Sequence, residues 1–172
     1  MSADDIPLVN AYWANLTSAD CDRMSIDPAM LPTRVLTPGM LQQRRSQPVR
    51  ERTVDTLIWE LNGRAVGQST LSRIRYGEYG EIHLHMIDEQ CRRSGYGLRF
   101  FVLTLQEFFR RFDLPLIVCE PSARNAGPNR LLQRLGFTIA RSYRTRPSDI
   151  TLEHEVNRYE ITRTLAHELL NR

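Results

Sequence analysis

The sequence predicts a mixed α/β (α+β) fold in which helices flank a central, mostly antiparallel sheet containing one parallel pair of strands. A tight hairpin around Asn62-Gly63 and a strictly alternating segment at residues 81–87 predict the antiparallel part. A long amphipathic helix then leads to an apolar run at residues 114–119, and a helical connection implies that the two strands run parallel. A length of 172 residues suits one domain, so residues 1–172 are expected to fold as a single domain.

The N-terminal part is expected to combine one helix with an irregular segment. Apolar residues recur at intervals of three and four over residues 4–16, which predicts a helix. Several prolines interrupt residues 17–50 and exclude a long element there, although residues 38–45 suit a short helix.

The hairpin is the clearest local signal in the chain. Its two arms, residues 53–61 and 65–74, are rich in residues that favour strands. Between them, Asn62-Gly63 supplies the two positive φ angles that a tight hairpin turn requires.

The second half alternates helices with strands. Seven apolar residues at helical spacing predict the long amphipathic helix, and they are Leu98, Phe101, Val102, Leu105, Phe108, Phe109 and Phe112. The elements expected after residue 119 are a helix at 128–135, strands at 137–143 and 156–162, and a helical tail at 165–172.

Composition and charge argue against nucleic-acid and membrane partners. The net charge is a mild +3, and the arginines are dispersed along the chain instead of gathered in one stripe. No apolar run approaches the roughly 20 residues of a membrane-spanning helix. Cys21, Cys91 and Cys119 are widely spaced and odd in number, and the N-terminus lacks a basic stretch leading into an apolar one. We therefore expect reduced thiols, no disulfide framework, no metal site, and a cytoplasmic protein.

A glycine-containing loop precedes the long helix and suits a phosphate group. The sequence of residues 92–97 is Arg-Arg-Ser-Gly-Tyr-Gly. Glycines let the backbone approach a ligand closely, and the unpaired amides at a helix N-terminus attract anions. The candidate cofactor-binding residues here are Arg92, Arg93, Ser94, Gly95, Tyr96 and Gly97.

Other phosphate-binding motifs fit this loop less well. Phe100 stands where a dinucleotide-binding fingerprint has its third glycine, and no Gly-Lys-Ser/Thr follows as in a Walker A loop. A turn glycine that merely starts a helix is the alternative without a ligand.

The chain resembles the GNAT superfamily of acetyltransferases over residues 53–162. The family motif Q/R-x-x-G-x-G/A is matched by Arg92, Gly95 and Gly97, and a second motif, Asn followed by Gly-Phe eleven residues later, is matched by Asn125 and Gly136-Phe137. The resemblance implies a GNAT fold, whose parallel strands splay apart, and acetyl-CoA as co-substrate without a metal.

The resemblance also implies how coenzyme A is held. The loop amides would bind its pyrophosphate, and the backbone of Met86 and Ile87 would bind the pantetheine arm and supply the oxyanion donor. Asn125 and Asn129 complete the implied cofactor-binding set, although Asn125 also suits a helix cap or an Asx turn.

One departure from the family concerns the proton donor to the departing thiolate. Many members carry a tyrosine four residues before Gly-Phe, where this chain has Leu132. Another group, water, or a tyrosine elsewhere (Tyr143 or Tyr159) would then protonate the thiolate.

Three polar side chains on one face of the alternating strand are the catalytic candidates: Glu81, His83 and His85. Attack on a thioester requires a neutral amine, so a positioned base is needed. Glu81 is the first candidate, because it lies eleven residues before Arg92, where the histone-acetyltransferase branch of the family has its glutamate. The alternatives are a solvent-facing strand, a bulge that turns one of the three away, and a zinc site on the two histidines.

The sequence thus predicts an N-acetyltransferase that joins acetyl-CoA and a primary amine, on a small molecule or a protein N-terminus, in a ternary complex. The alternative is a non-catalytic acyl-CoA-binding or regulatory module with the same fold. Residues 17–50 and 145–155 are expected to select the amine, whose identity the motifs leave open, and the acidic groups of the second segment suit a cation. An exposed sheet edge or the C-terminal tail offers a surface for a homodimer.

Overall fold

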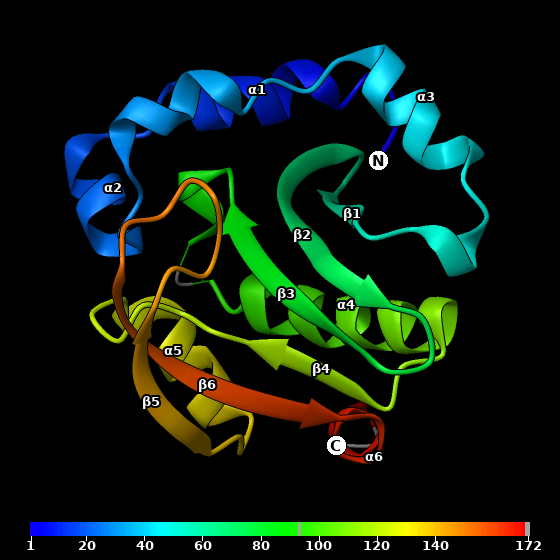
Figure 1. Cartoon of the computed structure of the whole chain (residues 1–172), viewed down its shortest axis with the longest axis vertical. Helices are drawn as coiled ribbons and strands as arrows, with labels where there is room; N and C mark the ends of the chain where they lie inside the picture. The colour runs from blue at the N-terminus through cyan, green and yellow to red at the C-terminus, as the bar shows by residue number, and fades with distance from the viewer. Residues whose placement is uncertain (93, 171–172) are drawn as a thin grey trace. The chain divides into compact units, whose positions relative to one another are not determined.

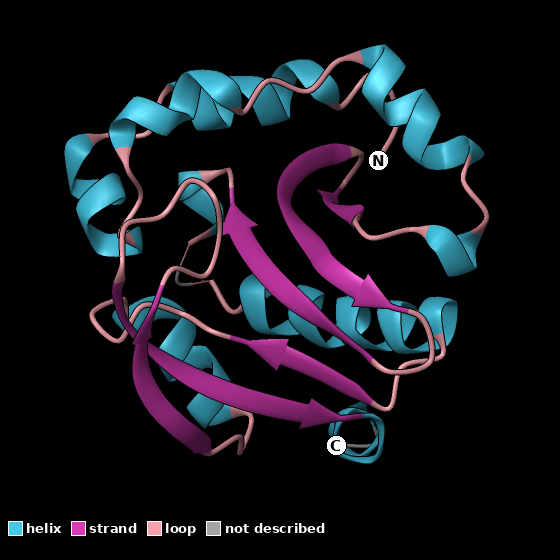
Figure 2. Cartoon of the chain, viewed as in Figure 1, coloured by secondary structure: helices cyan, strands magenta, loops and turns pink. Residues whose placement is uncertain are grey.

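The computed structural model describes residues 1–92 and 94–170, which fall into two compact units. The first unit contains Met1, Gln42–Cys119 and Glu160–Arg172, and the second contains Ser2–Leu41 and Glu120–Tyr159. Figure 1 labels the elements along the chain, and Figure 2 colours them by type. No helix among the described residues is both long enough and apolar enough to span a membrane.

The first unit is built on four strands. They are β1 (Asp55–Leu61), β2 (Arg64–Arg75), β3 (Tyr79–Met86) and β4 (Leu116–Cys119). β1, β2 and β3 pair antiparallel in that order, and β4 pairs with β3 in parallel. The mostly antiparallel arrangement with one parallel pair confirms the predicted fold class.

The hairpin between β1 and β2 turns as the sequence predicts. Asn62 has φ 53° and Gly63 has φ 75°, the two positive angles of a tight hairpin turn.

Helix α4 (Tyr96–Phe112) connects β3 to β4 and buries its apolar stripe, including Phe101, Leu105, Phe108 and Phe112. On its sheet side, Thr104 accepts hydrogen bonds from Trp59 on β1 (3.1 Å) and Ser69 on β2 (3.2 Å). Gly67 on β2 leaves room for the Trp59 ring, because a Cβ there would lie 2.5 Å from a ring carbon. Two short 3₁₀ helices, η2 (Val49–Glu51) and η3 (Glu89–Cys91), and the C-terminal helix α6 (Arg163–Leu170) complete this unit.

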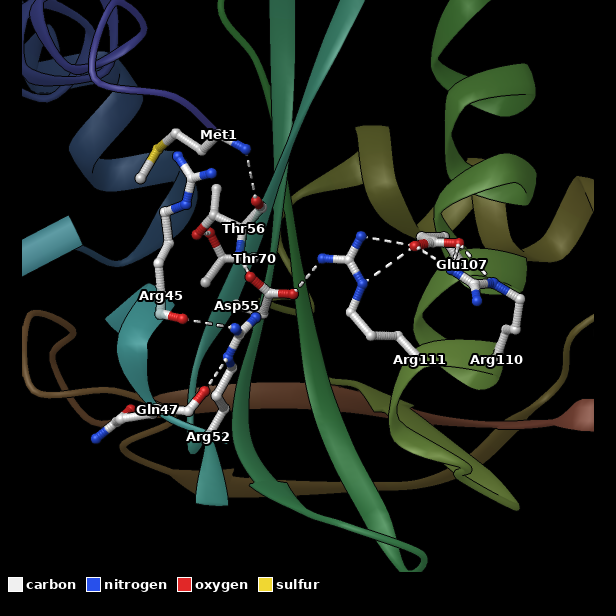
Figure 3. A network of polar contacts seen from close by, with 10 residues as sticks. All are labelled: Met1, Arg45, Gln47, Arg52, Asp55, Thr56, Thr70, Glu107, Arg110 and Arg111. Carbon is white, nitrogen blue, oxygen red and sulfur yellow. Dashed lines mark hydrogen bonds and ion pairs between the residues drawn. The ribbon is translucent and has the colours of Figure 1, made fainter. Parts of the chain in front are cut away.

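A network of ion pairs joins β1 to α4 (Figure 3). Arg111 on α4 donates to Asp55 on β1 at 2.6 Å and to Glu107, one turn earlier on its own helix, at 2.6 and 3.1 Å. Arg110 donates to the same Glu107 carboxylate. This network anchors the first strand of the sheet to the helix that opens at the glycine loop.

The second unit holds most of the N-terminal helices and the last strand pair. Its elements are α1 (Ile6–Ala14), α2 (Ser18–Met24), η1 (Pro28–Thr33), α5 (Ala126–Arg134) and β5 (Ile139–Thr145). Helix α3 (Pro38–Ser46) and strand β6 (His154–Thr162) each cross from one unit to the other. β5 and β6 pair antiparallel.

The expectation of an irregular segment at 17–50 was wrong for α2. Thr17 and Asp20 form a reciprocal capping box: the Thr17 hydroxyl accepts from the Asp20 amide at 3.1 Å, and the Asp20 carboxylate accepts from the Thr17 amide at 3.2 Å. Such a cap stabilises the start of a short helix that propensity alone would not predict. The short helix expected at 38–45 is present as α3.

Candidate active site

The parallel pair separates beyond its first residues. β3 pairs with β4 only as far as Glu81 and Val118, and then continues to Met86. On its other side, β3 stays paired with β2 through Gly67 and Met86. Among the described residues, the β4-facing edge of β3 from Ile82 to Met86 therefore has no strand partner, as the predicted splay requires.

The two backbone groups predicted to contact pantetheine point in different directions. The Ile87 amide donates to the Val66 carbonyl on β2 at 3.0 Å. Because backbone groups alternate along a strand, those of Met86 point to the β4-facing edge. There, the Arg92 guanidinium lies 3.5 Å from the Met86 carbonyl oxygen. Of the two, Met86 presents its backbone at the open edge.

The glycine loop lies at the end of this edge. Gly95 has φ 85° and caps α4, a conformation that favours glycine, and the first turn of α4 contains no acidic residue. The Ser94 hydroxyl donates to the Cys91 carbonyl at 2.7 Å, and Arg92 pairs with Glu89 at 2.8 Å. Helix N-terminal amides without an acidic neighbour form a site for an anion.

The remaining loop residues differ in their roles. Gly97 lies in the first turn of α4. The Tyr96 ring packs with Phe100, whose ring stacks on Trp59 at 5.3 Å between centroids, so the side chain of Tyr96 belongs to an apolar cluster. Arg93 lies outside the described residues.

The three catalytic candidates share one face of β3. The pairing of β2 with β3 is regular from Glu81 to Met86, and the irregularity lies between Ser72 and Arg75 on β2. Because side chains alternate along a regular strand, Glu81, His83 and His85 project from the same side. All three residues are half-buried.

Two of these candidates have defined partners on β2. Nη1 of Arg73 donates to both carboxylate oxygens of Glu81 at 3.1 Å. Nε2 of His83 lies 2.9 Å from the Ser72 hydroxyl oxygen. No pattern in the sequence indicates either partner, because Ser72 reaches His83 through the register of two strands and Arg73 reaches Glu81 through the irregularity that follows Ser72.

The two asparagines lie in the second unit and differ sharply. Asn129 is buried, and its amide makes four hydrogen bonds: Nδ2 donates to the carbonyls of Ser122 and Asn125, and Oδ1 accepts from Asn157 and the Tyr159 hydroxyl. Asn125 occupies the N-cap of α5 without a capping hydrogen bond from its side chain. The side chain of Asn129 is thus fully used inside its own unit, whereas that of Asn125 does not cap the helix.

Both tyrosines considered as proton donors to the thiolate are hydrogen-bonded. Leu132, at the usual tyrosine position, is fully buried, and so is Tyr159, whose hydroxyl donates to Asn129 at 3.0 Å. The Tyr143 hydroxyl donates to Glu120, which also pairs with Arg158 at 2.8 Å. Burial, together with the Glu120 carboxylate, raises the pKa of Tyr143 above its usual value. A phenol with a raised pKa is a weaker proton donor.

The segments expected to select the acceptor meet within the second unit. Ile26, after α2, pairs with Thr151 of the loop between β5 and β6 as an antiparallel bridge, and two backbone hydrogen bonds of 2.8 Å flank it. In the same loop, Glu153 pairs with Arg144 at 3.3 Å. One of the acidic groups expected to attract a cation is therefore already paired with an arginine.

No group of three or more His, Cys, Asp or Glu side chains within residues 1–92 and 94–170 is arranged to hold a metal ion.

The sequence matches a protein family over most of its length. Residues 3–138 match the family described as "Acetyltransferase (GNAT) domain". A comparison with curated proteins gives no match.

Solved structures share the fold at low sequence identity. A spermidine N-acetyltransferase from Vibrio cholerae in complex with CoA and spermine has a TM-score of 0.71 and 13% identity, covering 97% of this chain and 95% of that one. The aminoglycoside acetyltransferase AAC(6')-Ib in complex with coenzyme A has a TM-score of 0.70 and 16% identity, covering 98% and 95%. RimJ from Mycobacterium smegmatis, in complex with CoA-disulfide, has a TM-score of 0.72 and 15% identity, covering 99% and 86%.

Proposed function

Because the chain belongs to the GNAT acetyltransferase family, and is thus an acyltransferase, we propose that it transfers the acetyl group of acetyl-CoA to a primary amine. The transfer is direct, by attack of the amine on the thioester in a ternary complex. The acceptor amine belongs to a small molecule or to a protein N-terminus. The chain acts as a single domain in this proposal.

One observation carries the proposal: the open edge of β3 ends at a glycine-capped helix N-terminus. The edge from Ile82 to Met86 offers backbone groups to the amide-containing pantetheine arm. The amides at Gly95 and the first turn of α4 offer donors and partial positive charge to the pyrophosphate. With the phosphates at the loop, the pantetheine arm would run along the edge from Met86 toward Glu81, and the thioester would lie between Met86 and His83.

His83 is the base that the geometry favours. Both Glu81 oxygens contact the Arg73 guanidinium, whereas Nε2 of His83 contacts the neutral hydroxyl group of Ser72. An imidazole has a pKa close to neutrality and can take the proton of an ammonium group at physiological pH. Glu81 and His85 share the face, and the Glu81 carboxylate would attract and orient a cationic acceptor.

The rest of the mechanism follows from the strand edge. The neutral amine attacks the thioester carbonyl, and the Met86 amide at the open edge is the proposed donor to the developing oxyanion. The carbon–sulfur bond then breaks and releases the thiolate of coenzyme A. With Leu132 buried and Tyr143 bound to Glu120, we assign the protonation of this thiolate to water.

Calorimetric titration of acetyl-CoA into the wild-type protein and a Gly95→Glu variant tests the cofactor site. The new carboxylate would face the phosphates and remove the binding seen with the wild type. Gly77→Glu is a matched control, since Gly77 also has a positive φ (76°) and open space around it. Its amide donates to Phe112 at the far end of α4, roughly 25 Å away by the helical rise.

The control variant should bind acetyl-CoA as the wild type does. Equal loss in both variants, or no binding to wild type, would refute the assignment of the phosphate site. Turnover is then measured with a panel of amines (a polyamine, an aminoglycoside and a peptide with a free N-terminus), and acetylation of at least one is expected. Binding without acetylation of any amine in the panel would contradict the proposed transfer.

A further inference from the structure

We propose that Ser72 is a positioning residue for His83 and selects the imidazole tautomer that carries its proton on Nε2. The inference rests on the proposed function, in which His83 accepts the proton of the acceptor amine. The structural evidence for it is the set of contacts that the Ser72 hydroxyl group makes.

The Ser72 hydroxyl contacts two groups on β3. Its oxygen lies 2.9 Å from Nε2 of His83, and it lies 3.4 Å from the backbone carbonyl oxygen of Glu81. A carbonyl oxygen only accepts, and a serine hydroxyl has one proton to donate. When both contacts are formed, the serine proton points to the Glu81 carbonyl, so Nε2 of His83 must carry the proton and donate to the serine oxygen.

This arrangement leaves the basic lone pair of the neutral imidazole on Nδ1. The nitrogen that takes up a proton during catalysis is then Nδ1, while Nε2–H stays bonded to Ser72. A hydrogen bond from Nε2–H to an oxygen becomes stronger when the ring is cationic. Ser72 therefore both orients the ring and stabilises the imidazolium that forms when the amine is deprotonated.

The neighbouring hydroxyl on the same face is used elsewhere. Thr70 is the register partner of His83 across β2 and β3, yet its hydroxyl lies 3.2 Å from that of Thr56 on β1. Figure 3 shows Thr56 and Thr70 facing each other. His83 instead contacts Ser72, its diagonal neighbour, which long side chains reach across a strand pair.

The register of β2 against β3 fixes the position of Ser72. Ser72 is the last residue of β2 in regular register, opposite Glu81. The next residue, Arg73, has φ 47°, and its guanidinium contacts Glu81. Irregularities of this kind redirect side chains at a strand end. The regular pairing thus places the Ser72 hydroxyl at His83, and the irregularity that follows turns Arg73 toward Glu81.

The tautomer is measured directly by long-range ¹⁵N–¹H NMR correlation of the histidine rings in the wild-type protein, with His83→Gln used to assign the signals. We expect the Nε2–H pattern for His83 at a pH where the ring is neutral. In Ser72→Ala, the ring should show a mixture of tautomers. An Nδ1–H tautomer in the wild-type protein would overturn the proposal.

The kinetic test compares Ser72→Ala with Ser72→Thr and with Thr70→Val. Ser72→Ala should lower kcat about tenfold, the effect of a lost hydrogen bond to a charged group. It should also move the acid limb of the pH–rate profile to lower pH and leave KM for acetyl-CoA unchanged. Ser72→Thr, which keeps the hydroxyl, should restore the wild-type profile, and Thr70→Val should retain it.

The experiments distinguish a failure of the proposed function from a failure of the positioning role of Ser72. Absence of turnover in the wild-type protein contradicts the proposed function, while the NMR pattern still confirms or refutes the contact of Ser72 with His83. Normal turnover with an unchanged pH profile in Ser72→Ala refutes the positioning role and leaves the proposed acetyl transfer intact.

Discussion

Nη1 of Arg73 lies 3.1 Å from each carboxylate oxygen of Glu81. The Glu81 side chain is only 13% exposed, whereas that of Arg73 is 52% exposed. A half-exposed guanidinium thus lies over a mostly buried carboxylate on the face that carries the catalytic candidates. In the proposed site, Arg73 would therefore compete with a cationic acceptor for Glu81.

Replacing Arg73 by Gln should therefore strengthen the binding of cationic acceptors. The variant removes a repelling charge and one partner of the carboxylate, so KM for a cationic amine should fall about two- to fivefold, the range expected for a partly exposed ion pair. KM for acetyl-CoA should not change. The effect is measured by steady-state kinetics at low and high salt, and it should be smaller at high salt.

Arg75→Gln is the matched control for this change. Arg75 lies on the same strand and pairs with Glu78 at 3.8 Å, with both side chains about two-thirds exposed (65% and 64%). The control removes the same charge without releasing Glu81. An equal fall of KM in both variants would show a general effect of charge and contradict the competition between Arg73 and the acceptor.

The sequence predicted that the three catalytic candidates share a face but did not predict their partners, and the difference has a physical cause. Alternation along residues 81–87 follows from the two-residue period of a strand, so the shared face of Glu81, His83 and His85 was predictable. The contact of Ser72 depends on the register of β2 against β3, and that of Arg73 on an irregularity that only the paired strands define. Local patterns report periodicity, whereas register is a property of two segments together.

The two predicted cofactor asparagines illustrate the same limit. Both asparagines were predicted to bind the cofactor from their positions in the motif and on the following helix, but the two side chains differ in burial and in their hydrogen bonds. Asn129 is 7% exposed and makes four side-chain hydrogen bonds, whereas the Asn125 side chain makes no capping bond. A sequence does not show which of two amides is enclosed by its own fold.

Replacing each asparagine by Ala should accordingly give different phenotypes. Asn129→Ala leaves the partners of a buried amide unsatisfied and should lower the free energy of unfolding by about 3 kcal/mol. Asn125→Ala should leave stability within about 0.5 kcal/mol of wild type, as expected of a surface substitution. Urea unfolding of both variants measures the two effects. A loss of stability in Asn125→Ala as large as that in Asn129→Ala would contradict the difference between the two asparagines.

The buried hydroxyl of Thr104 offers a separate test of the packing of α4. Thr104→Val is nearly isosteric but removes the acceptor of Trp59 and Ser69. Two buried donors are then left without a partner, and we expect a loss of about 2 kcal/mol in the free energy of unfolding. Thr104→Ser keeps the acceptor and should cost about 1 kcal/mol for the lost methyl group. A larger loss in the Ser variant than in the Val variant would contradict the role of the hydroxyl.

The network around Glu107 predicts how stability depends on pH. Burial tends to raise the pKa of this carboxyl, but hydrogen bonds from Arg110 and Arg111 outweigh it, and the pKa lies below its usual value of 4.5. Because the folded state lowers the pKa, the stabilisation is present above the unfolded value and is lost as the pH falls through the folded value. The free energy of unfolding should therefore decrease below pH 4.5 in the wild-type protein.

Glu107→Gln should remove part of this acid dependence, because the variant has no proton to gain at that position. Its stability at pH 7 should be lower than that of the wild type, and the difference between the two should shrink at acid pH. Urea unfolding across the acid range measures both curves. Glu78→Gln provides the comparison, since Glu78 belongs to an exposed pair with Arg75, and its curve should run parallel to the wild type. A Glu107→Gln curve parallel to the wild type would mean that the ion pairs joining β1 to α4 do not contribute to acid sensitivity.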